Sequence, residues 1–405
     1  MRSKVGVLRV AGVCLVAALG AVGCASPGPV ADGGDAASGD AQGPSDASVG
    51  PAFEQPFDPG ITPASNAPRT IHVTVSSEQL GQEGFSYTAT PAMGEIVFVD
   101  GWEVRFDQIL ATIGDIRLNQ PSTNPANQSA IGAEVLRERR AFAIDVKKMG
   151  SFVGAGGGSE TAIPLFAMQQ TGAGAPLDPM IRYAFSYATV RARGDATNVN
   201  LSREQFADYN DMIARGWTML LSGTATYRGR APAAGTPEAD YSTSVRFRYG
   251  FGAPAEYINC QNPDNGADGA PGVAPRTTGA VRAQITFHID HMFWLRLNVE
   301  DPPPRFDHFA ARARAGAMGA PALSSLDDLM GVAPSNIVDR MTRPVPDRGG
   351  QTMGYTAPGA RLIAESNGSP GVDDLRSFVA FSSRAMMHLN ADGLCFTRPS
   401  GAFTF

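Results

Sequence analysis

The segment ITFHIDHMFW, residues 285–294, places His288 and His291 three positions apart with Asp290 between them. Imidazole nitrogens and carboxylate oxygens are ligands for copper and zinc. In a continuous strand the two rings would point to opposite faces, whereas a helical turn starting near Asp290 brings residues three apart onto one face. The segment therefore predicts a transition-metal site, on the condition that the chain bends near residue 290.

Two imidazoles leave a copper or zinc site incomplete, so further ligands must come from elsewhere. We expect help from Asp290 or from His308 in PRFDHFAA, and the other candidates are Asp307, His72 and His388. The chain has five histidines, so a histidine-rich site must draw on this set. The competing interpretation needs no metal, since histidines at strand ends also bond to backbone carbonyls.

Three classes of function follow from these residues. A binding module that holds a transition metal is the leading hypothesis, and a surface-interaction or structural protein without metal is the first alternative. The second alternative, a metal-dependent hydrolase, requires an open coordination position and a carboxylate that acts as a base. The glycine-rich segment from Gly154 lacks the lysine of a phosphate-binding loop, and no Gly-x-Ser-x-Gly elbow occurs in a strand-turn-helix setting. We therefore favour binding over catalysis.

The N-terminus has the features of an export signal. Basic residues precede an apolar run, VAGVCLVAALG, that is shorter than the roughly 20 residues needed to span a bilayer. The small residues before Cys24 resemble a bacterial lipoprotein box. Residues 1–23 are therefore predicted to be a lipoprotein signal peptide, and Cys24 the lipidated residue; an ordinary cleavage site is the alternative. We expect export to the cell envelope as an outer-membrane lipoprotein that faces the periplasm or the cell surface.

Composition divides the remainder of the chain. Residues 24–68 are rich in glycine, alanine and aspartate and cannot bury a core, which predicts a disordered tether. Residues 69–405 contain no low-complexity break and are expected to form a single elaborated domain. The formal net charge is −6, and the export signal contains three cations and no acid, so the mature chain is more acidic still. Nucleic acid is therefore excluded as a partner class, and the expected partner is a membrane, reached through the lipid anchor.

Cysteine usage agrees with export. Cys14 would leave with the signal peptide and Cys24 would carry the lipid, so Cys260 and Cys395 remain. In an oxidising compartment two leftover cysteines most simply pair. This disulfide would tie the middle of the domain to its C-terminal end.

Alternation of apolar and polar residues over the first two thirds of the chain predicts a mainly β fold. Glycine, proline and asparagine in the loops favour antiparallel sheets arranged as a sandwich or a barrel. A hairpin is expected around Asp100-Gly101, from strands 95–99 and 102–106, with a separate strand at 109–118. Helical periodicity is limited to patches, including 202–216 and a C-terminal helix that should end at Gly393 and cap the β-structure.

Two resemblances complement these patterns. The chain combines the acylated start with the segments GWEVRFDQILATIGDIRL and AQITFHIDHMFW, and with a closing helix that has a final cysteine. Through these features the chain resembles large exported lipoproteins of unassigned function from GC-rich Gram-negative bacteria. More distantly, Gly101–Leu118 is similar to the strand pair of the metallo-mystery pair family, exported β-rich proteins that bind copper through histidines and an oxidised tryptophan. This resemblance implies copper, and it directs attention to Trp294 beside the histidine pair.

Overall fold

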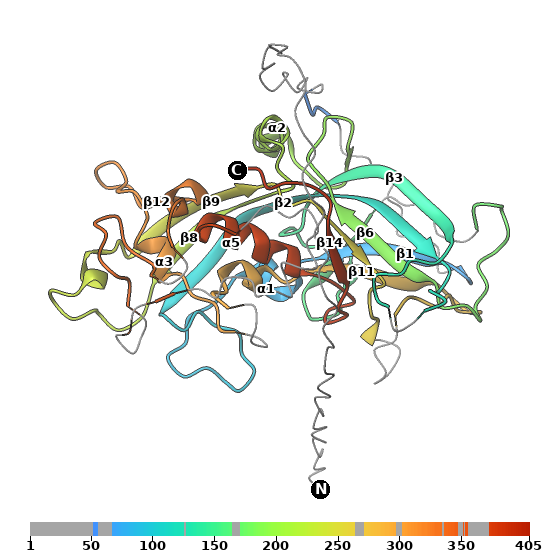
Figure 1. The fold of residues 1–405 in the computed structure, drawn as a ribbon, viewed down its shortest axis with the longest axis horizontal. Coiled ribbons are helices and arrows are strands. Elements are labelled where there is room, and N and C mark those ends of the chain that lie inside the picture. The colour runs from blue at the N-terminus through green and yellow to red at the C-terminus, as the bar shows by residue number, and fades with distance from the viewer. Residues whose placement is uncertain are drawn as a thin grey trace, which may run out of the picture. The chain divides into compact units, whose positions relative to one another are not determined.

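The longest strand, β2 (Trp102–Asn119), is the centre of the larger sheet (Figure 1). Its first half pairs with β8, and its second half pairs with β3 and β6. Register shifts beside Asp107 and Asp115 accommodate residues that would otherwise break the alternation. The predicted hairpin and the separate strand at 109–118 are therefore wrong, because residues 95–99 are not a strand and β2 is continuous.

The described strands form two mixed sheets. In spatial order, the smaller sheet comprises β13 (Met387–Leu389), β11 (Val281–Phe287), β1 (Ile71–Ser76), β5 (Ser159–Ala162) and β4 (Phe152–Val153). The larger comprises β12 (Ala322–Ser325), β9 (Ser244–Phe251), β8 (Met219–Tyr227), β2, β6 (Ala184–Thr189), β10 (Ala255–Ile258) and β14 (Phe396–Pro399), with β3 (Glu134–Asp145) on β2 and β7 (Thr197–Asn198) on β3.

The mainly β prediction is confirmed, but two details are wrong. The sheets are not purely antiparallel, because β1 pairs in parallel with β11, β9 with β12 and β3 with β7. Strands so distant in sequence have connections long enough for parallel pairing, and side-chain alternation carries no information on strand direction. The strand orders are also open, so neither sheet closes into a barrel within the described residues.

Both faces of the larger sheet are covered. One hydrophobic cluster takes side chains from both sheets, for example Ile285 and Ile113, together with Phe378 of the C-terminal helix. A second cluster on the opposite face includes Leu220 and Tyr209, the latter from α2. The helices are α1 (Glu78–Glu83), α2 (Phe206–Arg215), α3 (Asp307–Ala310) and α5 (Leu375–Ser382), and the 3-10 turns are η1 (Arg203–Gln205), η2 (Pro237–Asp240), η4 (Ile289–Phe293), η5 (Leu326–Leu329) and η6 (Ser383–Ala385). Figure 1 shows α2 and α5 on opposite sides of this sheet.

A short C-terminal helix is present, but it ends earlier than predicted. Asp374 caps α5 by accepting the backbone N–H of Ser377 at 2.9 Å. After η6 the chain becomes strand β13, which pairs with the edge of β11. Pairing with the sheet thus overrides the helical periodicity beyond residue 385, so that His388 lies on a strand and not on a helix.

The predicted disulfide between Cys260 and Cys395 is present. Cys260 follows β10 and Cys395 directly precedes β14, and these two strands pair with each other. The backbone N–H of Gln261 donates to the carbonyl of Leu394 at 2.8 Å beside the bridge. The disulfide therefore holds the segment that follows β13 against the larger sheet.

The computed structural model describes residues 52–55, 67–124, 127–163, 171–263, 271–296, 302–333, 336–346, 351, 353–354 and 372–405. The predicted signal peptide, Cys24 and most of the predicted tether lie outside these residues, and the domain boundaries stay predictions. Within the tether segment, Phe53 is buried against Phe206 and Tyr209 of α2. No helix in the described ranges is both long and apolar enough to cross a bilayer.

Removing the disulfide should destabilise the domain. The double variant Cys260→Ala/Cys395→Ala is expected to lose roughly 2–5 kcal/mol of unfolding free energy, because the bridge closes a long loop. Urea denaturation under oxidising conditions measures the difference. Reductant should lower the stability of the wild type and leave the double variant unchanged; equal stability of the two proteins in oxidising buffer would contradict the prediction.

Candidate metal centre

The chain bends directly after β11. Alternation ends at Phe287, and the 3-10 turn η4 follows, in which Ile289, Met292 and Phe293 are buried. The backbone N–H of His291 donates to the carbonyl of His288 at 3.2 Å, which closes the turn. The bend predicted near residue 290 is therefore present, because three apolar side chains at helical spacing enter the core together.

This bend brings the predicted ligands into one group. One ligand atom each from His288, Asp290 and His291 lie within 4.8 Å of one another, and the two imidazole centroids are 5.4 Å apart. Two ligands bonded at about 2 Å to one ion are at most about 4 Å apart. The group therefore needs only a small inward adjustment of its side chains to close on a metal ion.

A third imidazole comes from β13. Thr286 of β11 pairs with His388, and the ring of His388 lies 4.4 Å from that of His288 and 5.5 Å from that of His291. Sequence analysis named His388 only as one of several candidates, in a helix that does not extend to it. Strand pairing is what delivers this ring to the histidine pair.

His308 is not part of this group. It lies on α3, fully buried, with its ring 4.1 Å from that of Phe309. Burial and the charge of Arg305 lower its pKa to about 3. Of the other candidates, Asp307 accepts a hydrogen bond from Trp102, and His72 lies on β1 near Arg282.

Hydrogen bonds to the backbone assign the hydrogens on the three clustered rings. His288 Nε2 lies 3.0 Å from the carbonyl of Ala391, His291 Nδ1 lies 3.0 Å from that of Ala385, and His388 Nε2 lies 3.2 Å from the same Ala385 oxygen. A carbonyl only accepts, so these nitrogens donate, and in the neutral form of each ring the lone pair resides on the opposite nitrogen. Metal-binding histidines characteristically have one nitrogen held in this way.

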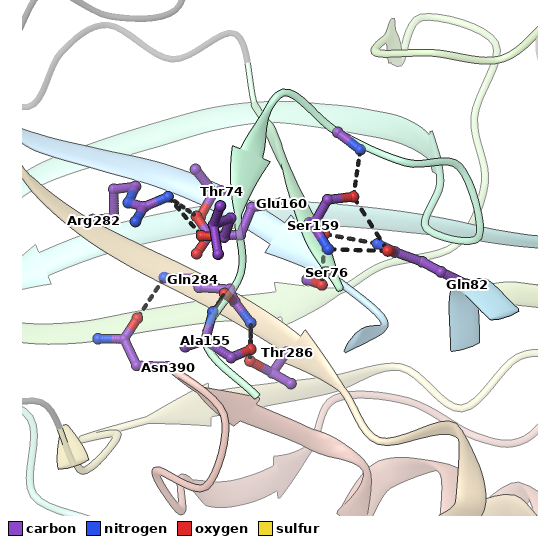
Figure 2. Close-up of polar contacts among 12 residues, drawn as sticks. Thr74, Ser76, Gln82, Ala155, Ser159, Glu160, Arg282, Gln284, Thr286 and Asn390 are labelled. Atoms are coloured by element: carbon purple, nitrogen blue, oxygen red, sulfur yellow. Dashed lines mark hydrogen bonds and ion pairs between the residues drawn. The ribbon is translucent and has the colours of Figure 1, made fainter. Parts of the chain in front are cut away.

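The Ala391 carbonyl is itself held in place by a polar network. Asn390 and Ala391 have positive φ angles of 49° and 66°, which is costly for residues other than glycine. Their turn is fixed because the backbone N–H of Gln284 donates to Asn390 Oδ1 at 2.8 Å, and that of Ala391 donates to Thr286 Oγ1 at 3.0 Å. Figure 2 shows Gln284 between Asn390 and Thr286, with its side-chain amide bonded to Thr286 and Ala155.

A separate set of hydrogen bonds holds the helix that carries a carboxylate not predicted from the sequence. In Figure 2 the amide of Gln82, on α1, bonds to the backbone N–H and carbonyl of Ser159 on β5. Helix α1 begins at Glu78, whose Oε2 lies 3.7 Å from His288 Nδ1. Glu78 is about 200 residues from the histidine pair in sequence, and no local pattern connects them. Only the pairing of β1 with β11 makes them neighbours.

Burial determines the charge of this centre. It lowers the pKa of His388 to about 3 and that of His291 well below its usual value, and the charges of neighbouring histidines act in the same direction. Burial also raises the pKa of Glu78 to about 7, with smaller contributions from Asp392 and Asp290, although His288 opposes the shift. At neutral pH, His291 and His388 are therefore neutral, the protonation state that binds metal.

Trp294 closes one side of the histidine group. Its ring stacks on that of His291, with centroids 3.6 Å apart and planes 29° apart. Its indole Nε1 is buried and has no hydrogen-bond partner among the described residues. The stacking restricts rotation of the His291 ring.

No family model, characterised protein or solved structure matches this chain. The resemblances drawn from sequence motifs therefore stay predictions. The functional argument depends on the geometry of the histidine group itself.

Acid should destabilise the metal-free protein through His388. The unfolded histidine binds a proton below about pH 6.5, whereas the folded one stays neutral down to about pH 3. The unfolded state thus binds more protons in this interval, and stability falls as pH falls by up to about 1.4 kcal/mol per pH unit. His388→Gln, which keeps a donor for the Ala385 carbonyl, should show a shallower slope in urea denaturation with chelator present. Identical slopes for both proteins would contradict the assignment.

Proposed function

We propose that this protein is an exported, lipid-anchored binding module whose β domain, with its two sheets packed as a sandwich, holds a transition metal. Copper or zinc would bind between His288, His291 and His388, with an oxygen ligand from Asp290 or Glu78. The observation that carries this proposal is the proximity of three rings, each with one nitrogen fixed by a backbone carbonyl and the other available to a metal when the ring is neutral.

The alternative without metal explains only half of this arrangement. It accounts for the backbone hydrogen bonds of the histidines. It leaves His388 Nδ1 and Glu78 Oε1, which are buried and without a hydrogen-bond partner in the described part of the chain. Each unsatisfied buried polar atom costs roughly 1–3 kcal/mol, and a bound cation at this position would satisfy both.

The donor set favours copper or zinc over calcium or magnesium. Imidazole nitrogens suit copper and zinc, whereas calcium and magnesium prefer oxygen ligands throughout. A divalent ion would also stabilise the ionised form of Glu78, so binding near neutral pH should release protons. Three imidazoles and one carboxylate oxygen would fill a four-coordinate site, which favours storage or transport over catalysis, because catalytic zinc keeps a coordination position open.

Export is the second part of the proposal. Its support is the disulfide between Cys260 and Cys395, a bond that persists in oxidising compartments and is rare in the cytosol. The lipidation of Cys24 and the anchoring at the cell envelope rest on the sequence motif alone.

Metal content tests the binding proposal. The full chain, loaded with zinc or copper and then desalted, should retain about one ion per chain when measured by elemental mass spectrometry. His288→Ala and His388→Ala should lose it, because each removes a nitrogen donor. His72→Ala is the matched control, because this histidine lies on β1 outside the group, and it should retain the ion. Wild-type protein free of metal, or equal loss in the His72 variant, would contradict the proposal.

Glu78 should tune the affinity. Glu78→Gln is expected to weaken metal binding by about 10-fold or more, because altering a group beside a metal ligand typically costs 10–100-fold. It should also abolish proton release on binding, since the carboxyl group is gone. Competition against a chromophoric chelator in weak and strong buffers measures both effects. Glu83→Gln, at an exposed position on the same helix, should bind as the wild type does; equal losses in the two variants would refute a specific role for Glu78.

A further inference from the structure

A second site lies at the start of β2 and shares no lining residue with the histidine group. It is a cavity of about 310 Å³ between β2, η2 and α3. Its wall contains the carboxylates of Asp100, Glu238 and Asp307 and three aromatic side chains, and it contains no lysine, arginine or histidine. The wall is thus acidic and aromatic at once.

Asp100 is held rigidly at this wall. Its Oδ2 accepts the backbone N–H groups of Phe306 at 2.6 Å and Asp307 at 2.8 Å. The residue is only 3% exposed, and its other oxygen, Oδ1, is buried with no hydrogen-bond partner among the described residues. The two backbone bonds fix Oδ2 and leave Oδ1 as an acceptor without a donor on a residue that lines the cavity.

Two more unsatisfied atoms come from the opposite wall. Glu238 lies in η2, and Tyr241 directly follows that turn. Glu238 Oε2 and the Tyr241 hydroxyl are both buried and have no hydrogen-bond partner in the described ranges. The residues that line the cavity therefore carry three unpartnered oxygens, from three separate side chains, that can accept a hydrogen bond.

Burial and like charge both disfavour the ionised carboxylates at this wall. Asp307 accepts a hydrogen bond from Trp102 Nε1 at 2.8 Å, yet burial and the neighbouring Asp100 raise its pKa well above its usual value. Burial also raises the pKa of Asp100. Arg305 opposes both shifts without outweighing burial, and it does not line the cavity.

We infer that this cavity binds a small organic cation, an ammonium group on a short apolar body. A primary ammonium has three N–H donors, which match Asp100 Oδ1, Glu238 Oε2 and the Tyr241 hydroxyl. Aromatic rings attract cations, and Trp102 provides one at the wall. The volume lies in the range of small-molecule sites, at about 300–1,000 Å³, and is far larger than a single dehydrated metal ion requires.

The probe is n-butylammonium, titrated into the full chain, with the indole N–H resonance of Trp102 followed by NMR. A saturable shift is expected, because this N–H bonds to Asp307 at the wall. The neutral isostere 1-butanol should cause none. A blocked Gly-Lys-Gly peptide that binds more tightly than n-butylammonium would identify the natural cation as a protein lysine, and weaker binding would identify a free amine.

Two variants and one control assign the site. Glu238→Gln should weaken n-butylammonium binding by about 10-fold through loss of a charged acceptor, and Tyr241→Phe should weaken it to a smaller extent. Asp240 belongs to the same turn but does not line the cavity. The Asp240→Asn variant, which also loses a negative charge, should therefore bind n-butylammonium as the wild type does. The inference is overturned by an absent or non-saturable shift, by an equal response to 1-butanol, by a response to calcium chloride alone, or by equal effects of the Glu238 and Asp240 variants.

Discussion

The antiparallel pairing of β13 with β11 is the constraint on which the candidate centre depends. β11 ends at Phe287 and bends, so His288 and His291 turn toward the strand beside them. β13 is only three residues long, and its middle residue is His388. Its two ends are secured independently, since α5 packs into the core before it and the disulfide at Cys395 holds the chain after it. A short edge strand would otherwise be a weak element, and here it holds the His388 ring beside those of His288 and His291.

Burial determines which protonation states the histidines and Glu78 adopt at this centre, and it makes their charged forms unfavourable. Neutral imidazoles tolerate a buried position, and the absence of their protons is what metal binding requires. Glu78 experiences the opposite effect, because burial disfavours its ionised form and leaves it titrating near neutral pH. A metal ion would reverse this balance by supplying positive charge to Glu78 and electron-pair acceptors to the rings. Burial has the same effect at the cavity lined by Asp100, where it raises the pKa of Asp100 and of Asp307.

The sequence predicts correctly those parts of the structure that local residue patterns determine. The predicted metal site required a bend near residue 290, which the structure contains, and the disulfide follows from counting cysteines in an exported chain. The sequence did not predict His388 as a strand residue, because helical periodicity through Met386 and Leu389 is overridden by pairing with β11. The sequence did not predict Glu78 as part of the centre. The parallel β1–β11 pair joins segments about 200 residues apart, and the alternation of apolar and polar residues does not specify which strands pair. His308 was attractive for its nearness in sequence, and α3 instead buries it beside Phe309.

X-ray absorption spectroscopy of the zinc-loaded protein tests the central claim most directly, because it counts the ligands at the metal. The account predicts a first shell at about 2.0–2.1 Å with outer-shell scattering from three imidazole rings. His388→Ala should reduce that number by one while His72→Ala leaves it unchanged. A shell composed only of oxygen atoms, or an imidazole count insensitive to His388, would contradict the account.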